Sequence, residues 1–269
     1  MVVREVVAKS IVTKSTLPES DYCINPYVGC AHACAYCYAR FMKRFTGHRE
    51  PWGEFVDVKL NAVELVRRKV TRAKTPLKGV ILLGSVTDAY QPLESKYKLT
   101  RGILEVLADE DCELSILTKS DLVVRDIDLL RRFSRCSVGL TLTTKDEDVR
   151  RRIEPRAAPT AKRIAALKEL HRSGIDTYAF IGPIMPYFTE LDHLLRDVQG
   201  IADSVWGEIL NVRAGNWRSL CGVLDTYWPK MRADFERKAR DSSYWDQVEA
   251  AFRRRATELG MPVVGFYRH

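Results

Sequence analysis

Short apolar runs alternate with amphipathic segments along most of the chain. Runs of six to eight residues that are rich in Val, Ile, Leu and Thr are typical of buried strands, and polar or glycine-containing segments bound each run. By this pattern we predict six strands, at residues 24–29, 78–85, 112–119, 136–143, 175–182 and 204–210.

The segments between these runs have helical patterns. Residues 160–172 repeat apolar side chains at helical spacing and stop just before Gly174, a residue that commonly ends helices. Two capping boxes, in which side chains three residues apart satisfy free amides at a helix start, are predicted at 61–64 and 189–192. Helices therefore alternate with strands.

Repeated strand, helix, strand units require right-handed crossovers and a parallel sheet. Six units suit either an open doubly wound sheet or a partly closed barrel, and both collect their chemistry at the carboxyl ends of the strands. We predict one α/β domain over residues 1–269, a partial (β/α)6 barrel of the TIM type. Its core spans about 22–212, and a helical extension over about 213–269 packs on it.

Three cysteines, Cys30, Cys34 and Cys37, follow directly after the first predicted strand. Spacings of three and two residues suit a loop wrapped around a single metal cluster. An iron–sulfur cubane usually takes four thiolates, so three leave one iron open. By analogy with catalytic zinc, a metal that lacks one protein ligand is placed to bind something else.

A zinc site is the alternative for the same thiols, with His32, His48 or Cys23 as fourth ligand. Closed zinc sites normally combine two separated ligand pairs, which this chain lacks. Cys112 and Cys136 open predicted strands and are expected in the core. We therefore favour an iron–sulfur cluster and predict no second one.

Composition narrows the function classes. With 269 residues, 46% of them hydrophobic, the chain can bury a full core, and it has no apolar run long enough to span a bilayer. Its first residues carry charges unlike a signal peptide, so we expect a cytoplasmic protein whose seven cysteines serve metal binding or catalysis. The formal charge of +8 favours a polyanionic or phosphorylated partner.

The stretch from Cys30 to Cys37, with Tyr36 before its last cysteine, resembles the signature of the radical S-adenosylmethionine (SAM) superfamily. That resemblance implies a [4Fe–4S] cluster whose open iron binds SAM. It also implies reductive cleavage of SAM to methionine and a 5′-deoxyadenosyl radical, with electrons from a donor such as a ferredoxin or flavodoxin. The cofactor would carry the hard step and the protein would position it.

Four stretches, at residues 29–40, 84–94, 117–120 and 151–175, together resemble the spore photoproduct lyase family and related DNA repair photolyases. Lys119 would then pair with the SAM carboxylate, Thr141 or Thr143 would reach its ribose, and Arg156 could bind a carboxylate or phosphate. The full set of residues implied to contact SAM is Tyr36, Thr87, Asp88, Lys119, Thr141, Thr143 and Arg156.

The chain departs from that family at one position. In the lyase, a cysteine in the stretch matching 84–88 returns a hydrogen atom to the product, assisted by two tyrosines. This chain keeps Tyr36 and Tyr38 but has Ser85 at the donor position. A serine O–H bond is too strong for that step, so Cys221 is the alternative donor, although a lone cysteine there is more often a small buried hydrophobe.

We therefore predict a radical SAM enzyme that acts on a nucleic acid or nucleotide, by a route other than spore photoproduct repair. The alternatives are a radical SAM enzyme that acts on a small metabolite or transfers an aminocarboxypropyl group, and a non-catalytic zinc or iron–sulfur protein that binds nucleic acid. Asn216 and Trp217 follow the last predicted strand, where a ring could stack on a base or adenine or pack against a helix.

Overall fold

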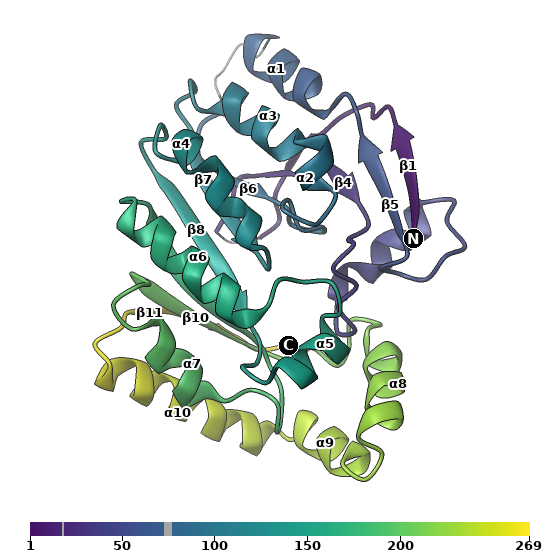
Figure 1. Cartoon of the computed structure of the whole chain (residues 1–269), viewed down its shortest axis with the longest axis vertical. Coiled ribbons are helices and arrows are strands. Elements are labelled where there is room, and N and C mark those ends of the chain that lie inside the picture. Colours follow the sequence, from purple (N-terminus) through teal and green to yellow (C-terminus); the bar gives the residue numbers. More distant parts are fainter. Residues whose placement is uncertain (18, 73–76) are drawn as a thin grey trace.

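The computed structural model describes residues 1–17, 19–72 and 77–269, and its centre is one eight-stranded sheet (Figure 1). All neighbouring strands in this sheet are parallel except β2 and β3. In spatial order the strands are β11 (Val263–Tyr267), β10 (Ser204–Ile209), β9 (Asp176–Ile184), β8 (Cys136–Leu142), β7 (Glu113–Thr118), β6 (Val80–Leu83), β3 (Tyr22–Ile24) and β2 (Val12–Lys14).

Within the described residues the two edge strands, β2 and β11, do not pair with each other, so the sheet is open. The parallel sheet with its crossover helices confirms the predicted partial barrel fold. Alternation along the strands sets its two faces: on β7, Ser115 and Leu117 line a cavity, while Ile116 between them is buried in the core. Five of the six predicted strands appear within two residues of their expected bounds.

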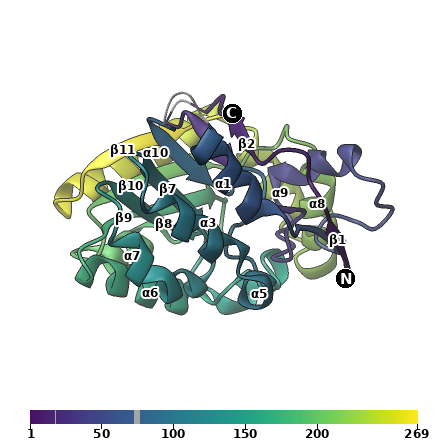
Figure 2. The same cartoon turned by 90° about the horizontal axis from the view of Figure 1, so that it is seen from above.

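Helices α6, α7 and α10 cover the face of β8 to β11 that is turned away from the cavity (Figures 1 and 2). None of the helices among the described residues is long and apolar enough to cross a membrane. The helices are α1 (Ala62–Arg72), α2 (Glu94–Tyr97), α3 (Leu99–Leu107), α4 (Ile127–Leu130), α5 (Glu147–Ile153), α6 (Thr160–Arg172), α7 (Leu191–Val198), α8 (Trp217–Tyr227), α9 (Arg232–Ala239) and α10 (Ser242–Glu258), with two short 3₁₀ helices, η1 (Tyr38–Phe45) and η2 (Asp121–Asp126).

A second, three-stranded sheet contains β1 (Val2–Val6), β5 (Phe55–Lys59) and β4 (Tyr27–Val28). The prediction of one continuous strand over 24–29 is therefore wrong. Ile24 ends β3 in the large sheet, and Tyr27 pairs with Val58 in the small one. Pro26 lies between them and has no N–H to continue a ladder, so the chain changes sheets there.

The C-terminal extension, predicted as helical, also adds strand β11 beside β10. Gly265 in this strand lies directly over the Trp206 ring, where a Cβ would come within 2.6 Å of the ring. The short, glycine-containing strand carries little periodic signal, and its pairing depends on a neighbour far away in the sequence.

Helix α6 has exactly the predicted bounds, and Gly174 follows it with φ +76°. Both capping boxes are wrong. The Asn61 amide exchanges hydrogen bonds with the backbone of Ala8, at 2.9 and 2.8 Å, and the Thr189 hydroxyl donates to the carbonyl of Thr143 at 2.8 Å. These side chains tie distant segments together instead of capping a helix, and Glu190 rather than Thr189 precedes α7 as its N-cap.

Candidate active site

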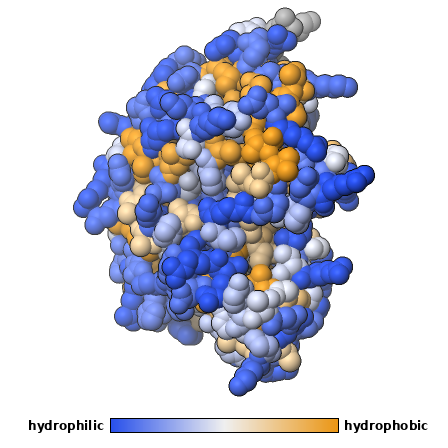
Figure 3. All heavy atoms as spheres, turned by 45° about the vertical axis from the view of Figure 1, so that its right-hand side comes forward, coloured by the Kyte–Doolittle hydropathy of each residue, from blue (hydrophilic) through white to orange (hydrophobic). Residues whose placement is uncertain are grey.

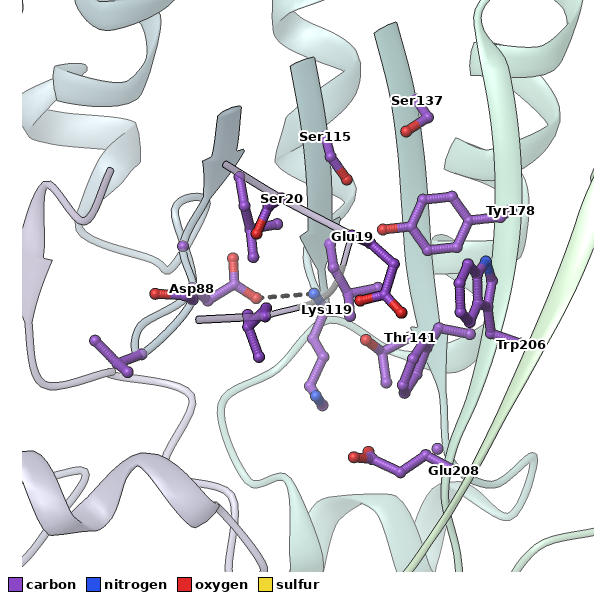
Figure 4. Close-up of a pocket in the computed structure, with 18 of the residues that line it drawn as sticks. Glu19, Ser20, Asp88, Ser115, Lys119, Ser137, Thr141, Tyr178, Trp206 and Glu208 are labelled. Carbon is purple, nitrogen blue, oxygen red and sulfur yellow. Dashed lines mark hydrogen bonds between the residues drawn. The ribbon is translucent and has the colours of Figure 1, made fainter. Parts of the chain in front are cut away.

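A cavity of about 1390 Å³ runs along the inner face of the large sheet. At one end the cysteine loop forms its wall, with Cys30, Cys34 and Cys37 all in the lining. Figure 4 shows side chains from several neighbouring strands extending into this space. The cavity extends along the strands and reaches their carboxyl ends, where the fold predicts the chemistry and where the cysteine loop lies.

The cysteine loop connects β4 to η1 and turns tightly. The amide of Ala33 donates to the Cys30 carbonyl at 3.3 Å, and that of Cys37 donates to the Cys34 carbonyl at 3.2 Å. Burial raises the pKa of Cys34 to about 12, although the charge of Lys119 opposes this. A metal centre is what would hold such buried thiols deprotonated. Among the described residues no three His, Cys, Asp or Glu side chains are arranged to hold a single metal ion, whereas a cubane takes each thiolate on a different iron, so the three thiols suit a cluster rather than one ion.

Gln91, which sequence reasoning missed, holds this loop in place. Its side-chain carbonyl accepts from the amide of Ala31 at 2.8 Å, and its NH₂ group donates to the hydroxyl of Thr87 at 3.1 Å. Thr87 in turn donates to the carbonyl of Gly29 at 2.6 Å. The hydroxyl predicted to contact SAM is thus directed to the loop, although Thr87 also lines the cavity.

Asp88 joins the end of β7 to the same loop. One carboxylate oxygen accepts from the Thr118 hydroxyl at 2.7 Å, and the other accepts from the backbone amide of Lys119 at 2.8 Å (Figure 4). Nε2 of His32 lies 3.1 Å from the second oxygen. Burial alone would raise the pKa of Asp88, but His32 and the hydrogen bonds lower it, so the carboxylate stays charged.

Four fully or nearly fully buried side chains, Tyr36, Thr143, Glu154 and Arg163, form a network beneath the loop, here called the buried network. The Tyr36 hydroxyl and the Arg163 guanidinium both donate to Glu154, and the Thr143 hydroxyl lies 2.8 Å from a Glu154 oxygen. Burial would raise the pKa of Glu154, but Arg163 and Lys119 lower it to about 2. Arg163 was missed because its helix pattern does not distinguish it from solvated arginines.

Lys119 and Thr141 have polar groups left over for a ligand. Both line the cavity (Figure 4), and in the described part of the chain neither side chain's polar group makes a hydrogen bond or ion pair. The Lys119 ammonium lies 5.7 Å from the centre of the Tyr36 ring. Burial would lower its pKa, but Cys34 and Glu154 raise it, so the group is charged. Thr143 belongs to the buried network instead.

Comparison with known proteins identifies the family of this chain. The family model of the radical SAM superfamily matches residues 24–198, which include the cysteine loop, Lys119 and Thr141. The chain belongs to the radical SAM superfamily. Its members generally use a [4Fe–4S] cluster and SAM, and the matched region contributes three thiols and an ammonium to the cavity.

Two relatives of this radical SAM protein differ in their sequence identity to it and in how much of their own length the match covers. An uncharacterized protein of Methanocaldococcus jannaschii is 40% identical over 223 residues, which are 83% of this chain and 82% of that protein. A protein of Pseudomonas phage M6, named radical SAM Nalpha-GlyT isomerase, is 26% identical over 67% of this chain and 37% of the phage protein.

Among solved structures, spore photoproduct lyase complexed with dinucleoside spore photoproduct superposes with a TM-score of 0.72. The match covers 98% of this chain and 82% of the lyase, at 17% sequence identity. At this identity the likeness establishes the shared fold, and it extends beyond the family-model match into the C-terminal extension.

Tyr38 and Ser85 lie together in the cavity of this radical SAM protein. The Tyr38 hydroxyl donates to the Ser85 carbonyl, and the Ser85 hydroxyl accepts from Asn25 at 3.0 Å. Asn216 also lines the cavity: its NH₂ donates to the Tyr36 carbonyl at 2.5 Å, while its buried carbonyl oxygen has no partner among the described residues.

Besides Thr143, three further predicted residues lie outside the cavity lining. Arg156 forms an ion pair with Glu54 at the surface, so its predicted contact with SAM is not what the structure shows. Cys221, the alternative hydrogen donor, lies on α8 and accepts from the guanidinium of Arg232 at 2.9 Å. Trp217 packs on the C-terminal helices rather than facing a base. All three follow turns whose direction the sequence does not reveal.

The fourth ligands required by the zinc alternative are engaged elsewhere. Both ring nitrogens of His48 face carboxylates, at 3.0 and 2.8 Å. His32 points its nitrogens toward Asp88 and a backbone carbonyl, at 3.1 and 3.2 Å. Cys23 lies in strand β3 between β2 and β6. The predicted zinc ligands therefore do not converge on the three thiols.

Proposed function

We propose that this protein is a radical SAM enzyme that acts on a nucleic acid or nucleotide substrate. Cys30, Cys34 and Cys37 would hold the [4Fe–4S] cluster. When bound and reduced, the cluster and SAM supply a 5′-deoxyadenosyl radical, which abstracts a hydrogen atom from the substrate. The observation that carries the proposal is that the thiols of Cys30, Cys34 and Cys37 share one cavity with the ammonium of Lys119, which forms no hydrogen bond or ion pair among the described residues.

The protein's own residues bind and orient. Lys119 offers a charged donor to the SAM carboxylate, and Thr141 offers a hydroxyl to the ribose. Thr87 and Asp88 keep the loop in shape rather than offering free groups to the cofactor. Of the two tyrosines, Tyr36 has its hydroxyl tied to Glu154 and acts as a positioning residue, whereas Tyr38 presents its phenol at the cavity beside Ser85.

A nucleotide-type substrate is supported by three observations. The formal charge of +8 favours a polyanion. The structurally similar lyase binds a dinucleoside spore photoproduct. The cavity, at about 1390 Å³, exceeds the range of about 300 to 1,000 Å³ typical of small-ligand pockets, which suits a cofactor and a substrate together. The residue at the lyase's donor position is Ser85, so a reaction other than spore photoproduct repair is proposed.

The first experiment is anaerobic purification, with iron and sulfide counted per chain, followed by dithionite and SAM and identification of the nucleoside products. The expected product is 5′-deoxyadenosine, abolished in Cys34→Ala and retained in the matched control Cys221→Ala, whose thiol lies outside the cavity. Bound zinc with intact SAM would overturn the proposal. Methylthioadenosine would instead indicate transfer of an aminocarboxypropyl group.

The substrate class is tested separately. Binding of single-stranded and double-stranded oligonucleotides to the reconstituted protein is measured at several salt concentrations. A nucleic-acid enzyme is expected to bind them with an affinity that falls steeply as salt rises, because phosphate contacts release counterions. If neither oligonucleotides nor nucleotides bind or change the SAM products, the nucleic-acid part of the proposal is wrong while the radical chemistry stands.

A further inference from the structure

A second, smaller groove of about 390 Å³ lies beside the cysteine loop. Helix η1, the segment near Trp52, and the loop after β10 form its walls. The lining residues are Arg40, Phe41, Lys43, Pro51, Trp52, Ala214 and Gly215. Phe41, Trp52 and Ala214 also line the main cavity, so the groove adjoins it, whereas Lys119 and Thr141 do not belong to the groove lining.

Cations gather around this groove without anionic partners. Arg40 and Lys43 line it, Arg44 follows on η1, and Arg49 and Arg213 lie within two residues of lining positions. Among the residues that the structure describes, none of these five cations forms an ion pair with a carboxylate, and Arg40 and Lys43 bond only to backbone carbonyls. Two cations in the lining and three close to it in the sequence, with the nearby Glu50 already paired to His48, favour a positive potential that attracts an acidic partner.

On the other described helices most arginines form an ion pair with an aspartate or glutamate. On α1, Arg68 lies 2.6 Å from Glu64, and on α9, Arg232 lies 2.6 Å from Glu236. The cations around the groove therefore differ from the usual surface of this molecule, where opposite charges alternate along the helices. The face seen in Figure 3 is mostly hydrophilic, with hydrophobic residues gathered in smaller areas.

Exposed aromatic rings accompany the cations. Phe41 is 40% exposed and Phe45 is 67% exposed, both on η1. The guanidinium of Arg44 lies 4.7 Å from the centre of the Phe45 ring and 5.5 Å from that of Phe41. Aromatic side chains and arginine are the residues enriched in the centres of protein interfaces. The combination indicates a protein partner.

The floor of the groove lies against the cluster ligands. Trp52 lines the groove and packs in one apolar cluster with Cys30, Cys37 and Phe55. Arg40, also in the lining, donates to the carbonyl of Cys37 at 3.2 Å. A protein seated here would therefore approach the cysteine loop at Arg40 and Trp52, beside the part of the cavity that Lys119 and Thr141 line.

We propose that this basic groove docks the electron donor, an acidic carrier protein of the flavodoxin or ferredoxin class. The inference rests on the proposed function, since it needs a cluster on the three cysteines. The reduced carrier would give one electron to the cluster and leave oxidised by one electron. A nucleic acid substrate is not the occupant we infer, because its reacting part must reach Lys119 and Thr141, which the groove does not contain.

The test is the charge-reversing double variant Lys43→Glu with Arg44→Glu. Formation of 5′-deoxyadenosine is measured with dithionite and, separately, with flavodoxin or ferredoxin that NADPH reduces through an NADPH-dependent flavodoxin/ferredoxin reductase. The carrier-driven rate is expected to fall about tenfold or more, because charge complementarity controls association, while the dithionite-driven rate changes less than about twofold. Binding of oxidised flavodoxin and of oxidised ferredoxin to the full-length protein is measured in parallel by calorimetry at low and high salt.

The matched control is Lys168→Glu with Arg172→Glu, two exposed cations on α6, which should change neither rate. Equal loss with dithionite and carrier, unchanged carrier-driven rates, or a wild-type protein that binds neither carrier would overturn the docking site. Loss of oligonucleotide binding with carrier binding retained would assign the groove to a nucleic acid backbone instead. If wild type cleaves no SAM with dithionite, the proposed function fails, and the binding measurement still tests the docking site.

Discussion

The buried network and the open wall of the cavity use similar residues in opposite ways. In the buried network, Glu154 and Arg163 are fully buried, and their charged groups contact one another, Tyr36 or backbone carbonyls. On the open wall, Lys119 and Thr141 present polar groups with no protein partner among the described residues. The closed region keeps the cysteine loop in shape, and the open region is available to bind.

Substitutions in the two regions should therefore affect different measurable quantities. Changes in the buried network should cost folding free energy, because they leave a buried charge or dipole without its partner. Changes on the open wall should cost ligand affinity and little stability, because no hydrogen bond or ion pair among the described residues is lost. Each prediction below compares the two regions by measuring both quantities.

The largest effect is expected from Glu154→Gln, which leaves the Arg163 guanidinium buried without its counter-charge. Such a loss typically costs about 3 to 5 kcal/mol in the free energy of unfolding. Urea unfolding of the cluster-free protein measures it. The control Glu169→Gln, at an exposed position on α6, should stay within about 0.5 kcal/mol. A loss below about 1 kcal/mol for Glu154→Gln would mean that the network does not stabilise the fold.

Acid should lower the free energy of unfolding through Glu154 and Asp88. The pKa of Glu154 is lowered to about 2, from an ordinary value of about 4.3, and that of Asp88 is lowered as well. Carboxylates with lowered pKa stabilise the protein fully above their unfolded pKa and lose that contribution as the pH falls through the folded pKa. Unfolding free energy should therefore decrease from about pH 5 toward pH 2, and less steeply in Glu154→Gln. Parallel profiles would contradict this.

On the open wall, Lys119→Met removes the free ammonium and keeps most of the apolar stem. Loss of a charge-assisted hydrogen bond of about 1.5 to 3 kcal/mol should weaken SAM binding by tenfold or more. Calorimetry on the reconstituted protein measures this affinity, and Lys168→Met, on the exposed face of α6, is the control. The free energy of unfolding should change by less than about 1 kcal/mol. Unchanged SAM affinity would remove Lys119 from the binding site.

The smallest and sharpest comparison uses two threonines at one strand end. Thr143→Val should cost about 1 to 3 kcal/mol of stability, because the hydroxyl near Glu154 and the Gly182 carbonyl is lost. Thr141→Val should leave stability within about 0.5 kcal/mol and weaken SAM binding only a few fold. Unfolding and SAM titration of both variants decide the matter. Equal stability loss in the two would erase the distinction between closed and open positions.

Much of the barrel could be predicted from local patterns. Five of the six predicted strands and helix α6 follow from apolar periodicity, because burial of one face imposes it. The small sheet of β1, β4 and β5 escaped prediction, as did β11, since short strands gain their stability from partners distant in sequence. The predicted caps at Asn61 and Thr189 failed for the same reason: each side chain had a better partner elsewhere.

The residues of the candidate site fall into the same two groups, those that a local pattern predicts and those whose role depends on distant segments. Lys119 and Thr141 are at strand ends, where parallel topology brings side chains together, so both could be anticipated. Gln91 and Arg163 could not, because an amide that holds a loop and a guanidinium that fills a core look like ordinary polar residues in a sequence. Arg156 was misplaced because its loop direction depends on Glu54, about a hundred residues earlier.

The sequence by itself determined the chemistry of the cysteine loop. Cys30, Cys34 and Cys37 lie within eight residues, so the covalent chain keeps the thiols near one another. Only the tertiary structure decided which other groups face them. The Thr143 hydroxyl contacts Glu154 and the Gly182 carbonyl, which come from separate segments, so it is held in the buried network. Thr141 uses only its backbone carbonyl, which accepts from Arg163, and its hydroxyl is left to the cavity. Contacts between distant segments depend on how the whole core packs, and no local pattern records them.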